Sequence, residues 1–157
     1  MPRRSFKRLT TAQDPVHDSY EVAKLINYIM VDGKKAVSRK LVYAALEKLK
    51  EVDPDPTKAL LRAIANVTPN MEVRPRRLGG ASYMVPTEVR KDRKLFLALN
   101  WIVEGARSRP NKEYHSFTDK LVAELKDAIN SVGSAYNKKI SVEKQADQNK
   151  AFAHLKW

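Results

Sequence analysis

A pair of glycines between two extended runs constrains the fold of this chain most strongly. The pair is Gly79-Gly80, and the surrounding segment 71–94 reads MEVRPRRLGGASYMVPTEVRKDRK, without the apolar spacing that a helix requires. A Gly-Gly pair between such runs is typical of the turn of a β-hairpin. Pro75 and Pro86 each lack the N–H group that a central strand donates to its neighbour. The segment therefore predicts a free-standing hairpin rather than part of a larger sheet.

The predicted hairpin, residues 71–90, places its charges in a definite pattern. A two-residue turn pairs Arg76 with Tyr83 and Arg74 with Val85, so that guanidinium groups and an aromatic ring share one face. Basic residues outnumber acidic ones over 71–94: Arg74, Arg76, Arg77, Arg90, Lys91, Arg93 and Lys94 against Glu72, Glu88 and Asp92. Because a lone hairpin is marginally stable in water, we expect a polyanion to hold it.

An excess of positive charge extends over the whole chain. Its 157 residues include 30 Lys and Arg against 18 Asp and Glu, which gives a formal net charge of +12. Such an excess is typical of a chain that binds a nucleic acid or another anionic surface. The length suits a single domain over residues 1–157.

Several classes of protein and site lack support in the sequence. Cysteine is absent, so neither a disulfide framework nor a thiolate metal site can form. No apolar run approaches the ~18 residues of a membrane span, and PRRSFKR near the start does not resemble a secretory signal. We expect a soluble, cytoplasmic chain with no membrane partner.

The residues of a catalytic site are also missing. His17, His115 and His154 are scattered, and the sequence has no nucleophile elbow, no zinc-protease pair and no Gly-rich phosphate loop. Asp53 and Asp55 flank Pro54 and suit a helix cap better than a metal site. We therefore expect no enzyme, no catalytic residue, no metal, no cofactor and no small-molecule substrate.

Apolar residues at helical spacing predict five or six helices around the hairpin. They lie between Asp18 and Gly33, between Lys34 and Asp53, between Asp55 and Pro69, over 92–108, between Ser116 and Gly133, and more weakly from Ser134, with a loose tail over 148–157. The fold class is mainly α: a bundle of five or six helices, with a two-stranded β-hairpin protruding between the third and fourth.

Five residues carry specific predictions about helix starts and about the core of this bundle. Asp18, Asp55 and Ser116 stand where the first, third and fifth helices should begin, and each is a good N-cap. Leu61 belongs to the stripe expected to be buried in the third helix. Trp101 lies within an apolar periodic run, which favours a core position over a base-stacking role.

Basic residues gather at three further places. They are Arg3, Arg4, Lys7 and Arg8 in an extended arm over 1–17, Lys34 and Lys35 at the start of the second helix, and Arg107 and Arg109 after the fourth. Cations at the start of a helix oppose its macrodipole, which indicates a partner rather than a gain in stability. The alternatives are a solvated tail and a solvated helix face. If these clusters meet on one face, they can contact phosphates along a folded nucleic acid.

The pattern favours RNA over DNA. A helix-turn-helix reader needs a recognition helix with polar side chains that read bases, whereas the strongest helices here carry apolar stripes. Basic loops and a protruding hairpin suit an irregular RNA that is recognised by its shape. The candidate RNA-binding residues are Arg3, Arg4, Lys7, Arg8, Lys34, Lys35, Arg74, Arg76, Arg77, Tyr83, Arg90, Lys91, Arg93, Lys94, Arg107 and Arg109.

Four segments form a specific combination: MVDGKK at 30–35, RRLGGASYMVPTEVR at 76–90, ALNWIVEGAR at 98–107 and NKAFAH at 149–154. With Trp157 at the end, the chain resembles the family of bacterial-type small-subunit ribosomal protein number seven over nearly its whole length. The family's RNA-facing basic residues match Arg3, Arg4, Lys34, Lys35, Arg76, Arg77 and Arg90.

The resemblance implies a structural constituent of the small ribosomal subunit. It implies a primary rRNA-binding protein that nucleates assembly of the 3′ major (head) domain and lies near the exit-site tRNA and the mRNA exit path, with small-subunit ribosomal protein eleven as a neighbour. The ribosome could be cytoplasmic or organellar.

Two other classes stay open from the residues alone. One is a general DNA-binding, architectural protein, and the other is a basic protein that docks on acidic partners. Co-sedimentation with small ribosomal subunits separates the three.

Overall fold

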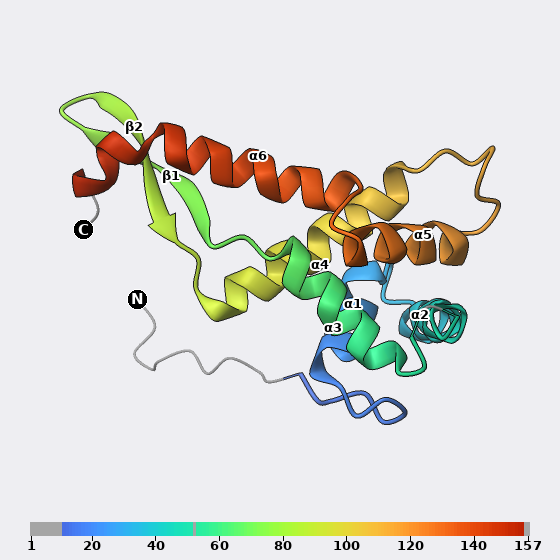
Figure 1. The fold of residues 1–157 in the computed structure, drawn as a ribbon. Coiled ribbons are helices and arrows are strands. Elements are labelled where there is room, and N and C mark those ends of the chain that lie inside the picture. The colour runs from blue at the N-terminus through green and yellow to red at the C-terminus, as the bar shows by residue number, and fades with distance from the viewer. Residues whose placement is uncertain (1–10, 52, 156–157) are drawn as a thin grey trace, which may run out of the picture.

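The computed structural model describes residues 11–51 and 53–155 (Figure 1). Its elements are α1 (Tyr20–Ile29), α2 (Lys35–Leu49), α3 (Pro56–Val67), β1 (Met71–Leu78), β2 (Ala81–Glu88), α4 (Lys91–Ser108), α5 (Phe117–Ile129), α6 (Ser134–Gln148) and the short 3-10 helix η1 (Lys150–Leu155). The central element is α4, which packs against α1, α3, α5 and α6. The prediction of a mainly helical fold with a hairpin between the third and fourth helices is confirmed.

The hairpin has the register that its turn predicts. The strands are antiparallel, with Arg76 opposite Tyr83 and Arg74 opposite Val85. Gly79 and Gly80 have φ values of 54° and 88°, a backbone region that other residues rarely adopt. Two successive positive φ angles match the right-handed twist of the strands, so the glycines fix both the turn and the pairing.

The helix starts follow local capping chemistry, with one correction. The side chain of Asp55 accepts hydrogen bonds from the first turn of α3, and that of Ser116 accepts one from the first turn of α5, as expected. The prediction for Asp18 is wrong, because Ser19 is the N-cap of α1 and its Oγ accepts from the N–H group of Val22 at 3.4 Å. Asp18 instead has a φ of 45°, which the turn before the helix requires.

The apolar core lies among α1 to α5 and includes Trp101 as predicted. Trp101 is 7% exposed and belongs to the same cluster as the buried leucines of the neighbouring helices. The prediction that Leu61 is buried is wrong, because its side chain is 42% exposed. Residues 60, 63, 64 and 67 already form the inward stripe of α3, and Leu61 lies one residue off that stripe.

The hairpin is supported along one side rather than free-standing. In Figure 1, α6 runs toward the two strands and η1 lies beside them, and both elements contact the hairpin. The ring of Phe152 in η1 packs against Tyr83, with centroids 5.4 Å apart. The backbone N–H of Asn70, just before β1, donates to Oε1 of Glu143 in α6 at 2.9 Å. Residues 150–155 therefore form a packed element where we expected a loose tail.

A buried carboxylate fixes α6 relative to the rest of the bundle. Glu124 in α5 is 1% exposed, and its Oε2 accepts from Nε and Nη2 of Arg109 at 2.9 and 2.6 Å. Its Oε1 accepts from the N–H of Ala135 at 2.9 Å and from Oγ of Ser134 at 3.1 Å, both in the first turn of α6. Asp127 also pairs with Arg109. Although burial disfavours the charged guanidinium, its bonds to Asp127 and Glu124 raise the pKa of Arg109 above the usual value.

Close packing around this carboxylate also constrains α4. A Cβ at Gly105 would lie 2.6 Å from Oε1 of Glu124 and 2.5 Å from Oγ of Ser134. Real Cβ atoms do not approach other atoms so closely, so a larger side chain at this position would displace the side chains of Glu124 and Ser134 and disturb the contact between them. The glycine is required by this close approach and not by its backbone angles.

Replacing Trp101 by alanine should lower the free energy of unfolding by about 3–5 kcal/mol, because it leaves a cavity in the core. Chemical denaturation measures the change. Asn100→Ala, at an exposed neighbour in the same helix, should stay within about 0.5 kcal/mol of the unmodified chain. Unchanged stability of Trp101→Ala together with a loss of RNA affinity would assign the indole to binding.

Glu124→Ala should lower the free energy of unfolding by about 3 kcal/mol, because it leaves the guanidinium of Arg109, whose side chain is 16% exposed, without its main partner. The remaining contact with Asp127 keeps the loss near the lower end for buried ion pairs. Thermal and urea melts provide the measurement. Glu113→Ala, in the exposed loop before α5, is the matched control, and equal effects of the two changes would contradict the assigned role.

Candidate nucleic-acid interface

The junction between the hairpin and α4 brings basic side chains from both elements together. Glu72 in β1 is 7% exposed and pairs with Arg74 of the same strand and with Arg93 of α4. Lys94 is also held at this junction, because its Nζ donates to Oδ1 of Asn70 at 3.0 Å. The hairpin is therefore joined to the helix that follows it by a network of charged and polar side chains.

The first turn of α4 concentrates positive charge at a helix N-terminus. Its N-cap residue, Arg90, makes no capping hydrogen bond with its side chain, and Lys91 and Arg93 follow with Asp92 as the acidic residue of that turn. The N-terminus of a helix carries a partial positive charge and unpaired N–H groups. Cations there lower helix stability, whereas an anion such as a phosphate is bound favourably.

The start of α2 repeats this arrangement. Its N-cap residue is Lys34, again without a capping bond from the side chain, and no acidic residue occupies the first turn. Lys34 and Lys35 are exposed, and Asp32 lies 3.9 Å from Nζ of Lys34 at the surface. A surface ion pair of this length contributes little, so Lys34 can exchange it for a phosphate.

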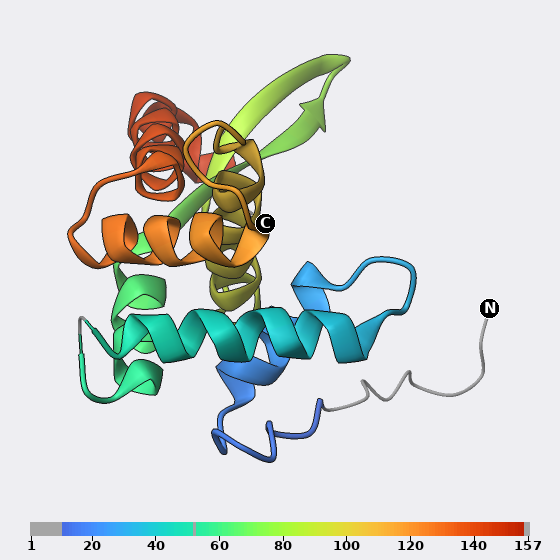
Figure 2. The same cartoon turned by 90° about the vertical axis from the view of Figure 1, so that its right-hand side faces the viewer.

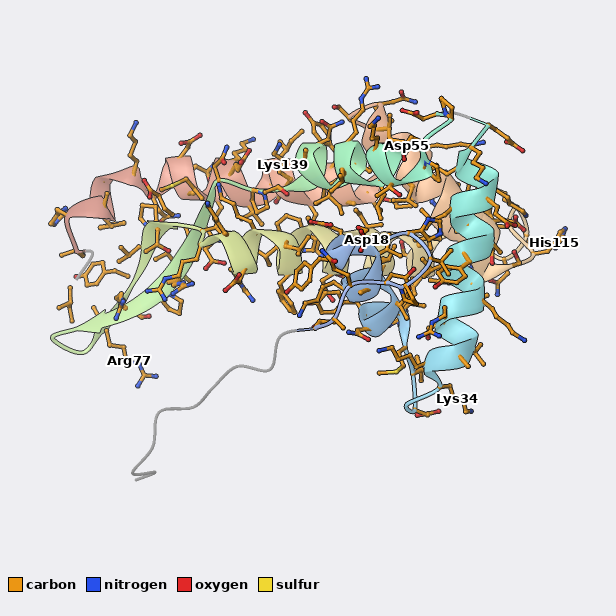
Figure 3. All side chains as sticks on the ribbon, turned by 90° about the horizontal axis from the view of Figure 1, so that it is seen from below. Asp18, Lys34, Asp55, Arg77, His115 and Lys139 are labelled. Carbon is orange, nitrogen blue, oxygen red and sulfur yellow. The ribbon has the colours of Figure 1, made fainter. Side chains whose placement is uncertain are left out.

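The tip of the hairpin presents a further cation. Arg77 is exposed and its side chain extends away from the strands in Figure 3. Arg76, on the opposite face, is half-buried, like its cross-strand neighbour Tyr83. Tyr83 packs on Phe152, so its ring supports the attachment of η1 to the hairpin. This contact offers a structural role for Tyr83 in place of the base-facing position that we expected.

The two basic residues after α4 have different surroundings. Arg107 is exposed, and its Nη2 donates to the carbonyl oxygen of Ile29 at 3.4 Å, which places it beside the loop that leads into α2. Arg109 turns inward, where Glu124 and Asp127 occupy its guanidinium. The side chain of Arg109 is therefore only 16% exposed, because the buried carboxylate of Glu124 and the partly exposed one of Asp127 both pair with it.

The predicted clusters meet only in part. Figures 2 and 3 place the tip of the hairpin and the start of α2 on the same side of the molecule, with Arg77 near one end and Lys34 near the other. Arg3, Arg4, Lys7 and Arg8 lie outside the described residues. The candidate interface in the described chain is therefore the side that carries the tip of the hairpin and the start of α2.

Sequence reasoning missed the side chains that orient these cations. The sequence predicted Glu72 only as one of the acids opposed to the basic residues. It gave no role to Phe96, whose ring lies under the guanidinium group of Arg93. The spacing offered a signal, since residues 72 and 74 lie on the same face of a strand and residues 93 and 96 lie one turn apart in a helix. An acid two residues before an arginine in a strand indicates a pair on one face.

Other kinds of site find no support in the part of the chain that the structure describes. Over residues 11–51 and 53–155, no three His, Asp or Glu side chains are grouped closely enough to hold a metal ion. No helix within those residues has the length and apolar character to cross a membrane.

Comparisons with known proteins show the family of the chain. The family model described as "Ribosomal protein S7p/S5e" matches residues 1–150. The chain is 46% identical over 159 residues to "Small ribosomal subunit protein uS7" of Caldicellulosiruptor bescii, 48% over 158 residues to that of Thermosipho africanus, and 46% over 159 residues to that of Thermodesulfovibrio yellowstonii. Each alignment covers 100% of both proteins. The chain therefore belongs to the ribosomal protein S7 family.

Proposed function

We propose that the chain is a structural constituent of the small ribosomal subunit that binds rRNA through the side running from the hairpin to the start of α2. Its family consists of ribosomal proteins, which are structural rather than enzymatic, so the chain is not an enzyme. The observation that carries the proposed binding side is the pair of helix N-termini, those of α2 and α4, where lysines and arginines take the place of side-chain caps.

Electrostatics supports this use of the two helix starts. Each combines a partial positive charge, unpaired N–H groups and full positive charges, which together favour a phosphate group. The same arrangement lowers the stability of the isolated chain, because like charges lie together. Phosphates of an RNA backbone can relieve that repulsion at several points at once. Shape and backbone contacts of this kind are typical of binding to a folded RNA.

We propose a wider set of residues for RNA binding. It comprises Arg3, Arg4, Lys7 and Arg8 in the arm, Lys34 and Lys35, Arg74, Arg76 and Arg77 in the hairpin, Arg90, Lys91, Arg93 and Lys94 at the start of α4, and Arg107. Arg109 and Tyr83 are left out, because the guanidinium of Arg109 pairs with the buried Glu124 and the ring of Tyr83 packs on Phe152.

The place within the subunit is the finer part of the proposal. We infer that the chain is a primary binder of the 3′ major domain of the small-subunit rRNA, that it nucleates assembly of the head, and that it lies near the exit-site tRNA and the mRNA exit path with small-subunit ribosomal protein eleven beside it. The elongated shape of the hairpin supports a reach toward such ligands (Figure 1). The ribosome would be that of the cytoplasm or of an organelle.

A sedimentation experiment tests the proposal against its rival, a general DNA-binding protein. Tagged chain is added to a lysate and separated on a sucrose gradient, and its position is compared with that of the small subunit. We expect co-sedimentation with small subunits that resists nuclease treatment specific for DNA. Migration with chromosomal DNA, or at the top of the gradient with acidic proteins, would reject the proposal.

Salt dependence should reveal the number of phosphate contacts. If about 6 to 10 phosphates are neutralised, log K plotted against log salt for a transcript of the 3′ major domain should have a slope between about −4 and −9. Filter binding over a series of salt concentrations gives the slope. An unrelated RNA of equal length should bind more weakly with a comparable slope, whereas a slope near zero would contradict a polyanion partner.

Arg77→Ala should weaken binding to the same transcript by about 1–2 kcal/mol, because it removes one charge-assisted contact, and should leave the melting temperature unchanged. Ser82→Ala is a close control, since Ser82 is exposed and directly opposite Arg77 in the hairpin. Filter binding beside circular dichroism melting distinguishes the two effects. A lower melting temperature with unchanged affinity would show that Arg77 supports the fold instead.

A further inference from the structure

We propose that Glu72 holds Arg74 and Arg93 as a clamp for one backbone phosphate of the RNA. This phosphate clamp, defined as the guanidinium groups of Arg74 and Arg93 with the carboxylate of Glu72 between them, rests on the RNA-binding function proposed above. In this clamp, a carboxylate promotes the binding of an anion, because it holds the two arginines in place. Glu72 and Phe96 act as positioning residues, and the two arginines are the groups that touch the phosphate.

The position of Glu72 is fixed by the base of the hairpin. Its side chain is 9% exposed, and it stands opposite Thr87 of β2, which is 8% exposed. Oγ1 of Thr87 donates to the backbone carbonyl oxygen of Glu72 at 3.4 Å. A carboxylate that is removed from water in this way requires charged or hydrogen-bonding partners nearby.

Both oxygens of this carboxylate are used by arginines from different elements. Oε1 accepts from Nε and Nη2 of Arg74 in β1, at 2.8 and 2.6 Å. Oε2 accepts from Nε of Arg93 in α4, at 3.3 Å. One carboxylate therefore sets the position of Arg74 relative to Arg93, although the turn of the hairpin and β2 lie between them in the sequence.

An aromatic pair restrains Arg93 further. Its guanidinium carbon lies 5.0 Å from the ring centroid of Phe96, one helical turn onward in α4. The ring of Tyr28 in α1 meets Phe96 edge-on, with centroids 5.6 Å apart and an angle of 75° between the planes. A cation held over an aromatic ring is attracted to it, so Arg93 loses less freedom when it binds a ligand.

The two arginines keep unused donors at the surface. A guanidinium group has five N–H donors, and Glu72 takes two from Arg74 and one from Arg93. The side chains of Arg74 and Arg93 are 50% and 45% exposed, so the remaining donors reach solvent. Each guanidinium group thus presents a fork of N–H donors that is already held in position, and such a fork suits the oxygens of an oxyanion.

The charge of the clamp matches a phosphodiester. Two guanidinium groups and one carboxylate leave one positive charge, and a backbone phosphate supplies one negative charge. The neighbouring Arg90 and Lys91 at the start of α4 raise the local potential for the phosphates on either side. A carboxylate of an acidic polypeptide is the competing ligand, but it offers two oxygens in one plane, whereas a phosphodiester can present oxygens to both forks.

Glu72→Gln tests the clamp by the sign of its effect. The change removes one negative charge, so general electrostatics alone predicts tighter binding to a transcript of the 3′ major domain. If Glu72 positions the arginines, affinity should instead fall by about tenfold, the effect of one misaligned charge-assisted contact. Filter binding at constant salt measures the affinity, and circular dichroism checks that the variant is folded.

The matched control is Glu88→Gln. Glu88 is exposed at the end of β2 in the same hairpin, so this variant has the same net charge as Glu72→Gln. Its affinity should equal that of the unmodified chain or exceed it slightly. If Glu72→Gln lowers the affinity for the transcript and Glu88→Gln does not, the loss arises from the position of the arginines and not from the change in net charge.

A second comparison separates positioning from a purely structural role. In a chain that already carries Arg74→Ala and Arg93→Ala, adding Glu72→Gln should cause no further loss of affinity, because there is nothing left to position. If Glu72→Gln does not fold, Arg74→Lys with Arg93→Lys keeps both charges, removes both forks and should lose about tenfold.

Several outcomes would overturn the clamp. The first is that folded Glu72→Gln binds the transcript as well as the unmodified chain or more tightly. The second is that adding Glu72→Gln lowers the affinity of the chain with Arg74→Ala and Arg93→Ala as much as it lowers that of the unmodified chain. Where the lysine variant is needed, the third is that Arg74→Lys with Arg93→Lys keeps full affinity. An equal change in affinity for polyglutamate would assign the site to acidic polypeptides instead. If the unmodified chain does not bind the transcript, the proposed function itself is rejected. If it binds, and Arg77→Ala lowers the affinity but these variants do not, only the clamp is rejected.

Discussion

The carboxylate of Glu124 is the interaction on which the arrangement of the second half of the chain depends. It bonds Arg109 after α4 and the first turn of α6 at the same time, from a position in α5 that is 1% exposed. Because an unpaired charge in such a place is costly, the three segments keep their relative positions only together. Gly105 allows the close approach of α4 that this contact needs.

The placement of α6 in turn determines how the hairpin is held. Glu143 in α6 accepts from the backbone before β1, Lys139 donates to the carbonyl oxygen of Asn66 at 2.8 Å, and Phe152 in η1 covers Tyr83. A two-stranded hairpin gains little stability from its own strands. The proposed binding residues of β1 are therefore oriented by the packing of the hairpin against the C-terminal helices, and Glu124 acts on them through α6.

Local chemistry explains which features the sequence predicts correctly. Gly79-Gly80 determines the register through backbone angles, and Asp55 and Ser116 cap helices through bonds to residues two or three positions onward. The surroundings of two candidate binding residues have a different cause. Arg109 and Tyr83 have partners 15 and 69 residues away, Glu124 and Phe152, and no periodicity in the sequence reveals such pairs. Fold class was thus predictable, whereas the pairing of Arg109 with buried and partly exposed carboxylates required the tertiary contacts.

The remaining conflict in the structure concerns the starts of α2 and α4. A helix is stabilised by an acidic or hydroxyl side chain at its N-cap, and α1, α3 and α5 each have one, in Ser19, Asp55 and Ser116. The other three begin at Gly133, Lys34 and Arg90, none of which makes a side-chain cap. Glu124 accepts from the first turn of α6, so α2 and α4 are the two whose first turns combine a missing cap with gathered cations. A phosphate would complete both caps and neutralise both clusters. The departures from optimal helix chemistry therefore favour the bound state over the free one, and they lie where the proposed RNA would bind.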